Sequence, residues 1–543
     1  MIVPDPNDMS QDSQIWVAWW SPGIALAYLP ALSSGLSMGT AARITSYVLT
    51  IAGSWGWLTV ADLLQANLLT KLSIGLILSL YAIGNSLLSA ALLEGGDILP
   101  FAVVPWLISY TICLVTLLEH SDKQFYLKLL HSLLLGLLLG AVYWLKYSAF
   151  LVSIGLFVYL CINFLRVSKT SFQQKGFLSI GCGLLFVVPP LSLTALNRLL
   201  SGSTTAIDQF TTFDFNSFGV EGWQILVTAF GAFGLALFQT SDWFRAIAES
   251  SSISSLDILR SLDPTQKREA VCLFLGIPST AIAVGLLVYF KNFYTKQVML
   301  LGFCITVIPL TLMLYLSITV GFNFLVDPIA RYAAPFIGFV QILLLYGYFQ
   351  FVRPTSQISI NQTYPVRFKP KLLASIAVLI ICVLPSGFIA QRFWTQYNVW
   401  RQVGTTYITT RNQLYEPALS YQNVQRVVRQ IDSLISSPLD VVALYMPQHP
   451  YYAGAWLELR KNRVLPLDAF GSVGAFYNQF DKFHTSQDLQ VVLVASTASV
   501  SGEADFSKLA KQFPQAISWE AIKPVKQSNV FIWLGQLDGT IDG

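Results

Sequence analysis

Ten segments of this chain are each mostly apolar over about twenty residues, roughly the length that a helix needs to cross a bilayer. Hydrophobic residues make up 54% of the 543 residues and charged residues only 11%, whereas soluble domains carry roughly 25% charged residues. The pattern predicts an all-α polytopic membrane protein with about ten transmembrane helices. The expected spans are residues 41–62, 72–92, 98–118, 129–145, 147–165, 177–199, 270–290, 297–320, 329–352 and 371–390.

One apolar run, residues 129–165, is too long for a single helix and is expected to fold back near Tyr143-Trp144-Leu145-Lys146. Each half would be short for a full bilayer. Apart from His131, Lys146 is the one residue of this run that carries or readily gains a charge. A charge at a helix centre costs about 2.5 to 3.5 kcal/mol on insertion scales. Lys146 is therefore a candidate functional residue, and the alternative is a lysine that snorkels at a helix end.

The distribution of basic residues predicts the orientation, because cytoplasmic loops carry an excess of Lys and Arg. One alternating set of loops holds twelve basic residues near three acidic ones. The other set includes residues 201–269, with eight acidic and four basic residues. We expect the first set inside and the second outside, provided that the borderline segment 222–238 lies along the surface. The twelve are Lys71, Lys123, Lys128, Arg166, Lys169, Lys175, Lys291, Lys296, Arg353, Arg367, Lys369 and Lys371.

Residues 391–543 differ in character from the rest of the chain. Short apolar runs rich in β-branched residues, at 441–446, 491–495 and 530–534, alternate with amphipathic helical patterns at 424–434 and 506–513. This alternation predicts a small soluble α/β domain. Because the domain follows an outward helix, we expect it to be extracytoplasmic.

Other classes of site have little support in the sequence. The six cysteines lie in apolar runs without a C-x-x-C pair, and the four histidines have no i, i+4 partner. These spacings argue against a Cys- or His-based metal site. The net charge of +4 and the lack of a basic stretch with interleaved aromatic residues argue against nucleic acid as a partner.

Four segments suggest a function by their order along the chain. An acidic stretch with Asp5, Asp8 and Asp12 precedes "QIWVAWWSPG" (14–23), and "GGDILP" (95–100) follows as a short acidic loop. Next come "LLGLLLGAVYWLKYSAFLV" (134–152) and "DPIARYAAPFIGF" (327–339). This order resembles the GT-C superfamily of integral-membrane glycosyltransferases, of the protein mannosyltransferase and aminoarabinose transferase kind. Members of this kind usually begin with a helix leading outward, so the sequence is interpreted as lacking one upstream helix.

The resemblance implies a GT-C-like transmembrane domain at 1–390 with an external first loop at 1–40, and the charge distribution adds a large external loop at 201–269. It also implies transfer of a sugar from a polyprenyl-phosphate or polyprenyl-diphosphate carrier to an acceptor on the extracytoplasmic side of the bacterial inner membrane. A carboxylate would orient or deprotonate the acceptor, and cations would stabilise the leaving phosphate. The sequence lacks a D-x-D pair, so a divalent metal stays possible and no cofactor is certain. The implied catalytic residues are Asp5, Asp8 and Asp97, and the implied substrate-binding residues are Glu94, Lys146, Arg331, Tyr332 and Trp20.

Several of these residues also have a structural interpretation. Asp5 and Asp8 could form a solvated acidic stretch, Asp97 could cap the helix that contains Pro100, and Arg331 could pair with Asp327. At the level of the whole chain, the alternatives are a transporter or flippase for a lipid-linked or small solute, and a non-catalytic truncated relative. Transporters tend to show internal repeats, and no repeat is visible in this sequence.

The orientation yields a first prediction. Cysteines introduced at Ser203 and Ser499 should react with a membrane-impermeant thiol reagent in intact cells, because both residues lie in segments expected outside. A cysteine at Ser356, in the basic stretch expected inside, should react only after permeabilisation. Labelling at Ser356 in intact cells would reverse the predicted orientation.

Overall fold

The computed structural model describes most of the helical region and most of the C-terminal sheet. The described residues are 3–13, 21–36, 38–66, 68, 70–72, 98–119, 125–166, 171–201, 230–231, 233–234, 272–320, 330–352, 421–445, 459, 462–467, 482–486, 488–496, 503–514, 517–523 and 530–537. Predicted spans 72–92 and 371–390 lie almost wholly outside them, as does most of segment 222–238.

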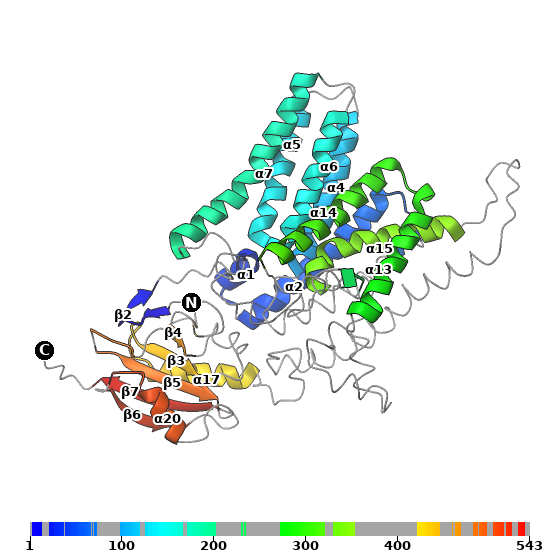
Figure 1. The fold of residues 1–543 in the computed structure, drawn as a ribbon. Coiled ribbons are helices and arrows are strands. Elements are labelled where there is room, and N and C mark those ends of the chain that lie inside the picture. Colours follow the sequence, from blue (N-terminus) through cyan, green and yellow to red (C-terminus); the bar gives the residue numbers. More distant parts are fainter. Residues whose placement is uncertain are drawn as a thin grey trace, which may run out of the picture.

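Eight of the predicted spans coincide with described helices, which form a bundle (Figure 1). Four of these helices, α4 to α7, are long and apolar enough to cross a membrane. The helices are α2 (Met38–Leu63), α4 (Ile98–Glu119), α5 (Phe125–Leu145), α6 (Tyr147–Arg166), α7 (Phe172–Ser201), α13 (Ile277–Tyr289, after a π-helical turn at Cys272–Gly276), α14 (Lys296–Val320) and α15 (Ala330–Val352).

The outer surface of the bundle is strongly apolar, as the surface of a membrane-spanning bundle would be. Helix α7 exposes a row of large apolar side chains, among them Ile180, Leu184 and Leu191. In water such a surface would favour aggregation, whereas lipid tails accommodate it. The same helix buries Leu178, Cys182 and Phe186 against its neighbours, so the inner and outer faces of α7 are both apolar.

The predicted break between the fourth and fifth spans is confirmed. Helix α5 ends at Leu145, α6 begins at Tyr147, and Lys146 is the single residue between them. The expectation that both halves are short was wrong: α5 has 21 residues and α6 has 20. Helix α5 gains its length at the other end, because it begins at Phe125, before the strongly apolar part of the run.

Lysines stabilise helix ends at the end of the bundle opposite Lys146. Lys128 Nζ donates a hydrogen bond to Leu118 O at 3.2 Å, near the end of α4, and Lys175 Nζ donates one to Leu165 O at 2.9 Å, near the end of α6. Carbonyl groups in the last turn of a helix lack intrahelical partners and carry partial negative charge. Two of the basic residues that predicted the orientation therefore also serve as C-terminal caps.

Helices α5 and α7 approach each other closely at Gly136 and Gly140. A Cβ atom at Gly136 would collide with Cys182 O, and one at Gly140 would collide with Phe186 O. Small residues four positions apart allow two membrane helices to approach at backbone distance. The Gly-x-x-x-Gly pair in "GLLLG" thus determines how α5, and with it the break at Lys146, sits against α7.

The C-terminal region contains a five-stranded mixed sheet of order β4-β3-β5-β7-β6. Strand β3 pairs in parallel with β4 and β5, and β7 pairs antiparallel with β5 and β6. The strands are β3 (Val441–Tyr445), β4 (Arg463–Pro466), β5 (Gln490–Ser496), β6 (Ile517–Ile522) and β7 (Val530–Leu537).

Two helices, α17 (Tyr421–Leu434) and α20 (Glu503–Ala510), supply apolar side chains to the two faces of this sheet. Val442 and Leu444 of β3 pack in one core with α17, whereas Val441 and Ala443 pack in the other with Leu509 of α20. This alternation is the period of two expected for a strand that is buried on both faces. The described part of the C-terminal region is therefore α/β, as predicted.

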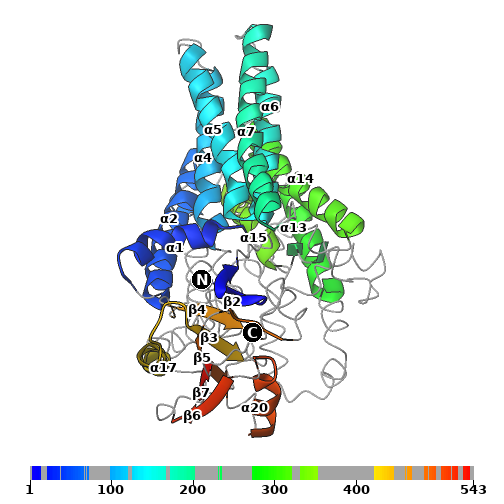
Figure 2. The ribbon, with the colours of Figure 1, turned by 90° about the vertical axis from the view of Figure 1, so that its left-hand side faces the viewer.

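The acidic stretch at the start of the chain forms a β-hairpin, which the sequence did not predict. Strand β1 (Val3–Asp5) pairs antiparallel with β2 (Asp8–Ser13). Helix α1 (Gly23–Ser33) follows and lies at the end of the bundle that faces the sheet (Figure 2). In both views the hairpin lies between the bundle and the C-terminal sheet (Figures 1 and 2).

The packing of α5 on α7 can be tested with Gly140→Val. The added side chain would force the two helices apart, and overpacking of this kind costs about 1 to 3 kcal/mol. We expect a lower apparent melting temperature for the detergent-solubilised protein. Gly285→Val is the matched control in α13, where a Cβ would meet no described atom within 4 Å. Equal melting temperatures for Gly140→Val and the wild type would show that α5 and α7 do not pack at this distance.

Candidate functional site

The turn Ser21-Pro22-Gly23 lies against the break between α5 and α6. Ser21 Oγ donates a hydrogen bond to Leu145 O at 3.0 Å. A Cβ atom on Gly23 would lie 2.5 Å from both Leu145 Cα and Leu145 O, which no side chain can tolerate. Glycine is therefore required here for a close approach of two backbones. The turn fixes the start of α1 directly on the residue before Lys146.

Lys146 is buried at this junction, with only 8% of its surface exposed. Its main-chain N donates to Val142 O at 2.9 Å, and its carbonyl accepts hydrogen bonds from Ala149 N and Phe150 N at 3.1 and 3.3 Å. The backbone thus passes from α5 to α6 with helical hydrogen bonds on both sides of the break. The position from which the Lys146 side chain projects is therefore well fixed.

Polar and aromatic side chains surround the break. Asn197 of α7 is 1% exposed, and its Nδ2 donates to Tyr147 Oη at 3.4 Å. The Tyr147 ring lies 4.7 Å from the Tyr143 ring, and Trp144 Nε1 donates to Pro189 O at 2.8 Å. A buried amide and a phenol therefore lie next to the buried residue Lys146, at one end of α5, α6 and α7.

Ser21, Tyr147 and Asn197 were not predicted as site residues. Asn197 offered a weak signal, since it is an amide near the end of an apolar segment. The contact of Ser21 with Leu145 spans 124 residues. Only the resemblance, which placed the "WWSPG" turn and the lysine-bearing helix in one family pattern, connected these two segments.

The carboxylate of Asp8 accepts hydrogen bonds within the hairpin and from the C-terminal sheet region. Its Oδ1 accepts hydrogen bonds from Ser10 Oγ at 2.6 Å and Ser486 N at 3.1 Å, and its Oδ2 accepts one from Ser486 Oγ at 2.7 Å. Partial burial opposes the charge on Asp8, but the hydrogen bonds from Ser10 and Ser486 hold the pKa of its carboxyl well below its usual range. A carboxylate with so low a pKa is a weak general base.

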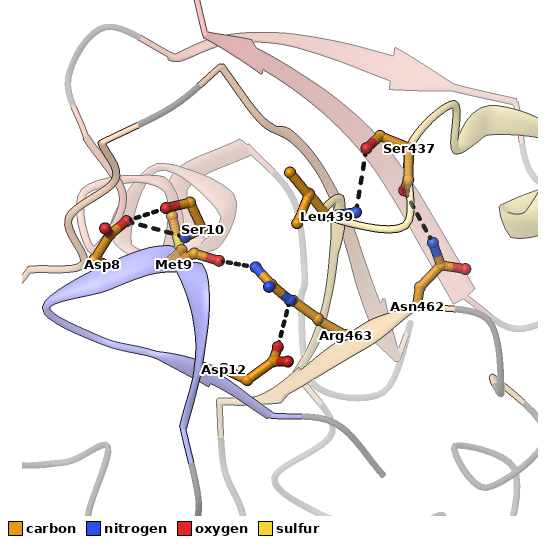
Figure 3. Close-up of polar contacts among 8 residues, drawn as sticks. All are labelled: Asp8, Met9, Ser10, Asp12, Ser437, Leu439, Asn462 and Arg463. Carbon is orange, nitrogen blue, oxygen red and sulfur yellow. Dashed lines mark hydrogen bonds and ion pairs between the residues drawn. The ribbon is translucent and has the colours of Figure 1, made fainter.

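Asp5 and Asp12, on either side of Asp8 in the sequence, have different environments, and Figure 3 shows that of Asp12. Asp12 Oδ1 lies 2.7 Å from Nε of Arg463, the first residue of β4. Asp5 ends β1 and accepts a hydrogen bond from Asn7 N at 2.9 Å, which closes the hairpin turn. Two of the three acidic residues of the hairpin are thus bound to the C-terminal region, and Asp5 stays within the hairpin.

The other predicted site residues divide into two groups. Arg331 and Tyr332 lie in the first turn of α15. Asp97, Glu94 and Trp20 lie outside the described residues. The structure therefore joins the Ser21 turn to Lys146. That Arg331 and Asp97 belong to the same site stays a prediction.

Among the residues that the structure describes, no group of three or more His, Cys, Asp or Glu side chains could hold a metal ion. Cys113, Cys161, Cys182 and Cys304 are free thiols within the helices. The ligand chemistry offered at the α5–α6 break is that of hydrogen-bond donors and a cation, which suits an anionic group such as a phosphate.

Comparisons of the chain with models of known protein families, with curated proteins and with solved structures find no match. The interpretation of the site therefore depends on its own geometry and on the sequence pattern.

Gly23→Ala tests whether the Ser21–Gly23 turn positions Lys146. The added methyl would displace α1 from Leu145 at a cost of about 1 to 3 kcal/mol, so the buried ammonium should become more reactive. We expect faster acylation of Lys146 by a water-soluble amine reagent, measured by peptide mass spectrometry, with exposed Lys296 as an internal reference. Ala25→Val, at an exposed position of α1, should leave the rate unchanged. Unchanged acylation in Gly23→Ala would mean that the turn does not position Lys146.

Proposed function

We propose that this protein is a membrane glycosyltransferase of the GT-C type. It moves a sugar from a polyprenyl-phosphate or polyprenyl-diphosphate carrier to an acceptor on the extracytoplasmic side of the bacterial inner membrane. In this proposal the carrier phosphate binds at the α5–α6 break, its lipid chain lies along the apolar helices, and the sugar faces the C-terminal region.

The observation that carries the proposal is the burial of Lys146 at the α5–α6 break. A snorkelling lysine extends its charged end into water, whereas Lys146 is packed inside the protein at the end of an apolar helix pair. Burying a cation is costly, and such residues in membrane proteins usually belong to a functional site. In this proposal the carrier phosphate accepts charge-assisted hydrogen bonds from the Lys146 side chain.

Neighbouring groups suit the same ligand. Tyr147 and Asn197 supply hydrogen-bonding groups beside the break, and Ser21 places the first loop there. We propose that Arg331 and Tyr332, in the first turn of α15, bind the same carrier, and that Glu94 and Trp20 contact the sugar. A divalent metal stays an open part of the proposal.

The acceptor-activating carboxylate is assigned to Asp97 or Asp5 in preference to Asp8. Both oxygens of Asp8 accept hydrogen bonds from the protein, and its low pKa makes it a poor proton acceptor. An effective general base has a pKa nearer to the working pH.

Transfer from a panel of radiolabelled polyprenyl-phosphate sugars, with membranes that contain the full chain, tests the function. Lys146→Met keeps most of the apolar stem and removes the charge. Loss of a charge-assisted hydrogen bond costs about 1.5 to 3 kcal/mol, so carrier binding should weaken about 10- to 100-fold. Lys296→Met, an exposed lysine at the opposite end of the bundle, should bind the carrier normally.

Two outcomes would contradict the proposal. Wild-type carrier binding in Lys146→Met would mean that the phosphate site lies elsewhere. Movement of labelled carrier across the bilayer, without sugar transfer to any acceptor, would indicate a flippase.

A further inference from the structure

The hairpin of residues 3–13 completes the C-terminal domain. The side chain of Met9 is fully buried, and it lies in the core that Val441, Leu465 and Phe513 form on the α20 face of the sheet. Burial of a Met side chain stabilises a fold by about 1.5 to 3 kcal/mol. The core of this domain thus includes a side chain from the far end of the sequence.

Main-chain hydrogen bonds attach the hairpin to the segment that precedes β5. Met9 N donates to His484 O at 2.7 Å, and His484 N donates to Pro6 O at 3.0 Å. Hydrogen bonds between main chains depend on geometry and not on side-chain identity. They show that the hairpin sits in the domain in a defined register.

Arg463 is the buried centre of the same contact (Figure 3). It is 6% exposed, its Nη1 donates to Met9 O at 2.8 Å, and its Nε pairs with Asp12 at 2.7 Å. A buried guanidinium group needs such partners, because an uncompensated buried charge is strongly destabilising. The hairpin supplies both of these partners.

The connection from the hairpin to the bundle is short. Eight residue steps separate Ser13 from Ser21, and even a fully extended chain of this length spans at most about 28 Å. Ser21 in turn is hydrogen-bonded to Leu145, the neighbour of Lys146. The hairpin, and the domain that holds it, must therefore lie near the Lys146 end of the bundle.

We propose that residues 3–13 are an attachment element, which fixes the C-terminal domain over the Lys146 end of the bundle, and that Asp8, Asp12 and Arg463 are positioning residues of this attachment. The hairpin and the sheet then share one side of the membrane. An even number of crossings must separate Ser13 from Tyr421, a condition that the ten predicted spans satisfy.

The attachment predicts a specific disulfide. Ser10 Oγ and Ser486 Oγ lie 3.0 Å apart although 476 residues separate them. In the full chain, Ser10→Cys combined with Ser486→Cys should form a disulfide under mild oxidation, identified as a cross-linked peptide by mass spectrometry. Ser10→Cys combined with Ser433→Cys, at an exposed position on α17, should not. Absence of the first cross-link, or equal yields of both, would overturn the attachment.

Hydrogen exchange provides a measurement that needs no activity. Asp12→Ala removes the partner of Arg463 Nε and should raise the exchange rate at the Met9 amide about tenfold or more, as expected for loss of a hydrogen bond to a charged group. Asp488→Ala, at an exposed carboxylate of the same domain, is the matched control, and its Met9 amide should exchange at the wild-type rate. Unchanged exchange at Met9 in Asp12→Ala would contradict the role given to this ion pair.

A rescue experiment distinguishes a positioning role of Asp8 from a catalytic role. This experiment rests on the proposed function, because it measures sugar transfer. Asp8→Ala should lower sugar transfer, and oxidation of the Ser10→Cys/Ser486→Cys pair in the same chain should restore it, with loss again on reduction. If Asp8 were the catalytic base, the cross-linked Asp8→Ala chain would stay inactive, and the positioning role would be wrong. If the wild-type chain transfers no sugar, the proposed function fails, and the cross-link and exchange results still decide the attachment.

Discussion

The close contact between Gly23 and the main chain of Leu145 determines the arrangement at one end of this molecule. Lys146 follows Leu145 directly, so the contact fixes the place of the buried cation relative to α1. The hairpin precedes α1 by a short connection, and the hairpin is part of the C-terminal domain. A single backbone-to-backbone approach, possible only without a side chain at position 23, thus links the first loop, the lysine and the sheet.

Much of the helical region could be predicted from the sequence, because the bilayer sets the length of an apolar run. The ends of α4 and the break at Lys146 were predicted to within a residue or two. Strands β3, β5 and β7 were found because their runs are apolar and β-branched. Edge strands β4 and β6 were missed: β4 is short and begins with Arg463, and β6 carries Ser518 and Glu520 on its outer positions.

The hairpin could not be predicted from local pattern. The sequence of β2, "DMSQDS", has low strand propensity, and its contacts with β1 and with the C-terminal domain hold it in place. The same tertiary contacts separate the roles of aspartates that look alike in the sequence. Lys146 could be predicted because it is a charged residue in an apolar run. Ser21 and Asn197 could not, because they reach the site through contacts with Leu145 and Tyr147, which are 124 and 50 residues away in the sequence.

The separation of 476 residues between Ser10 and Ser486 has a consequence for how the protein assembles during its synthesis. Ribosomes add about 5 to 20 residues per second, so the hairpin segment is made roughly half a minute to a minute and a half before its partner. During this time Met9 and the aspartates have no domain to join, and the helices enter the membrane one after another. The C-terminal domain can close its core only when both segments have reached the same compartment, which makes its assembly a late step that depends on correct insertion of the helices between them.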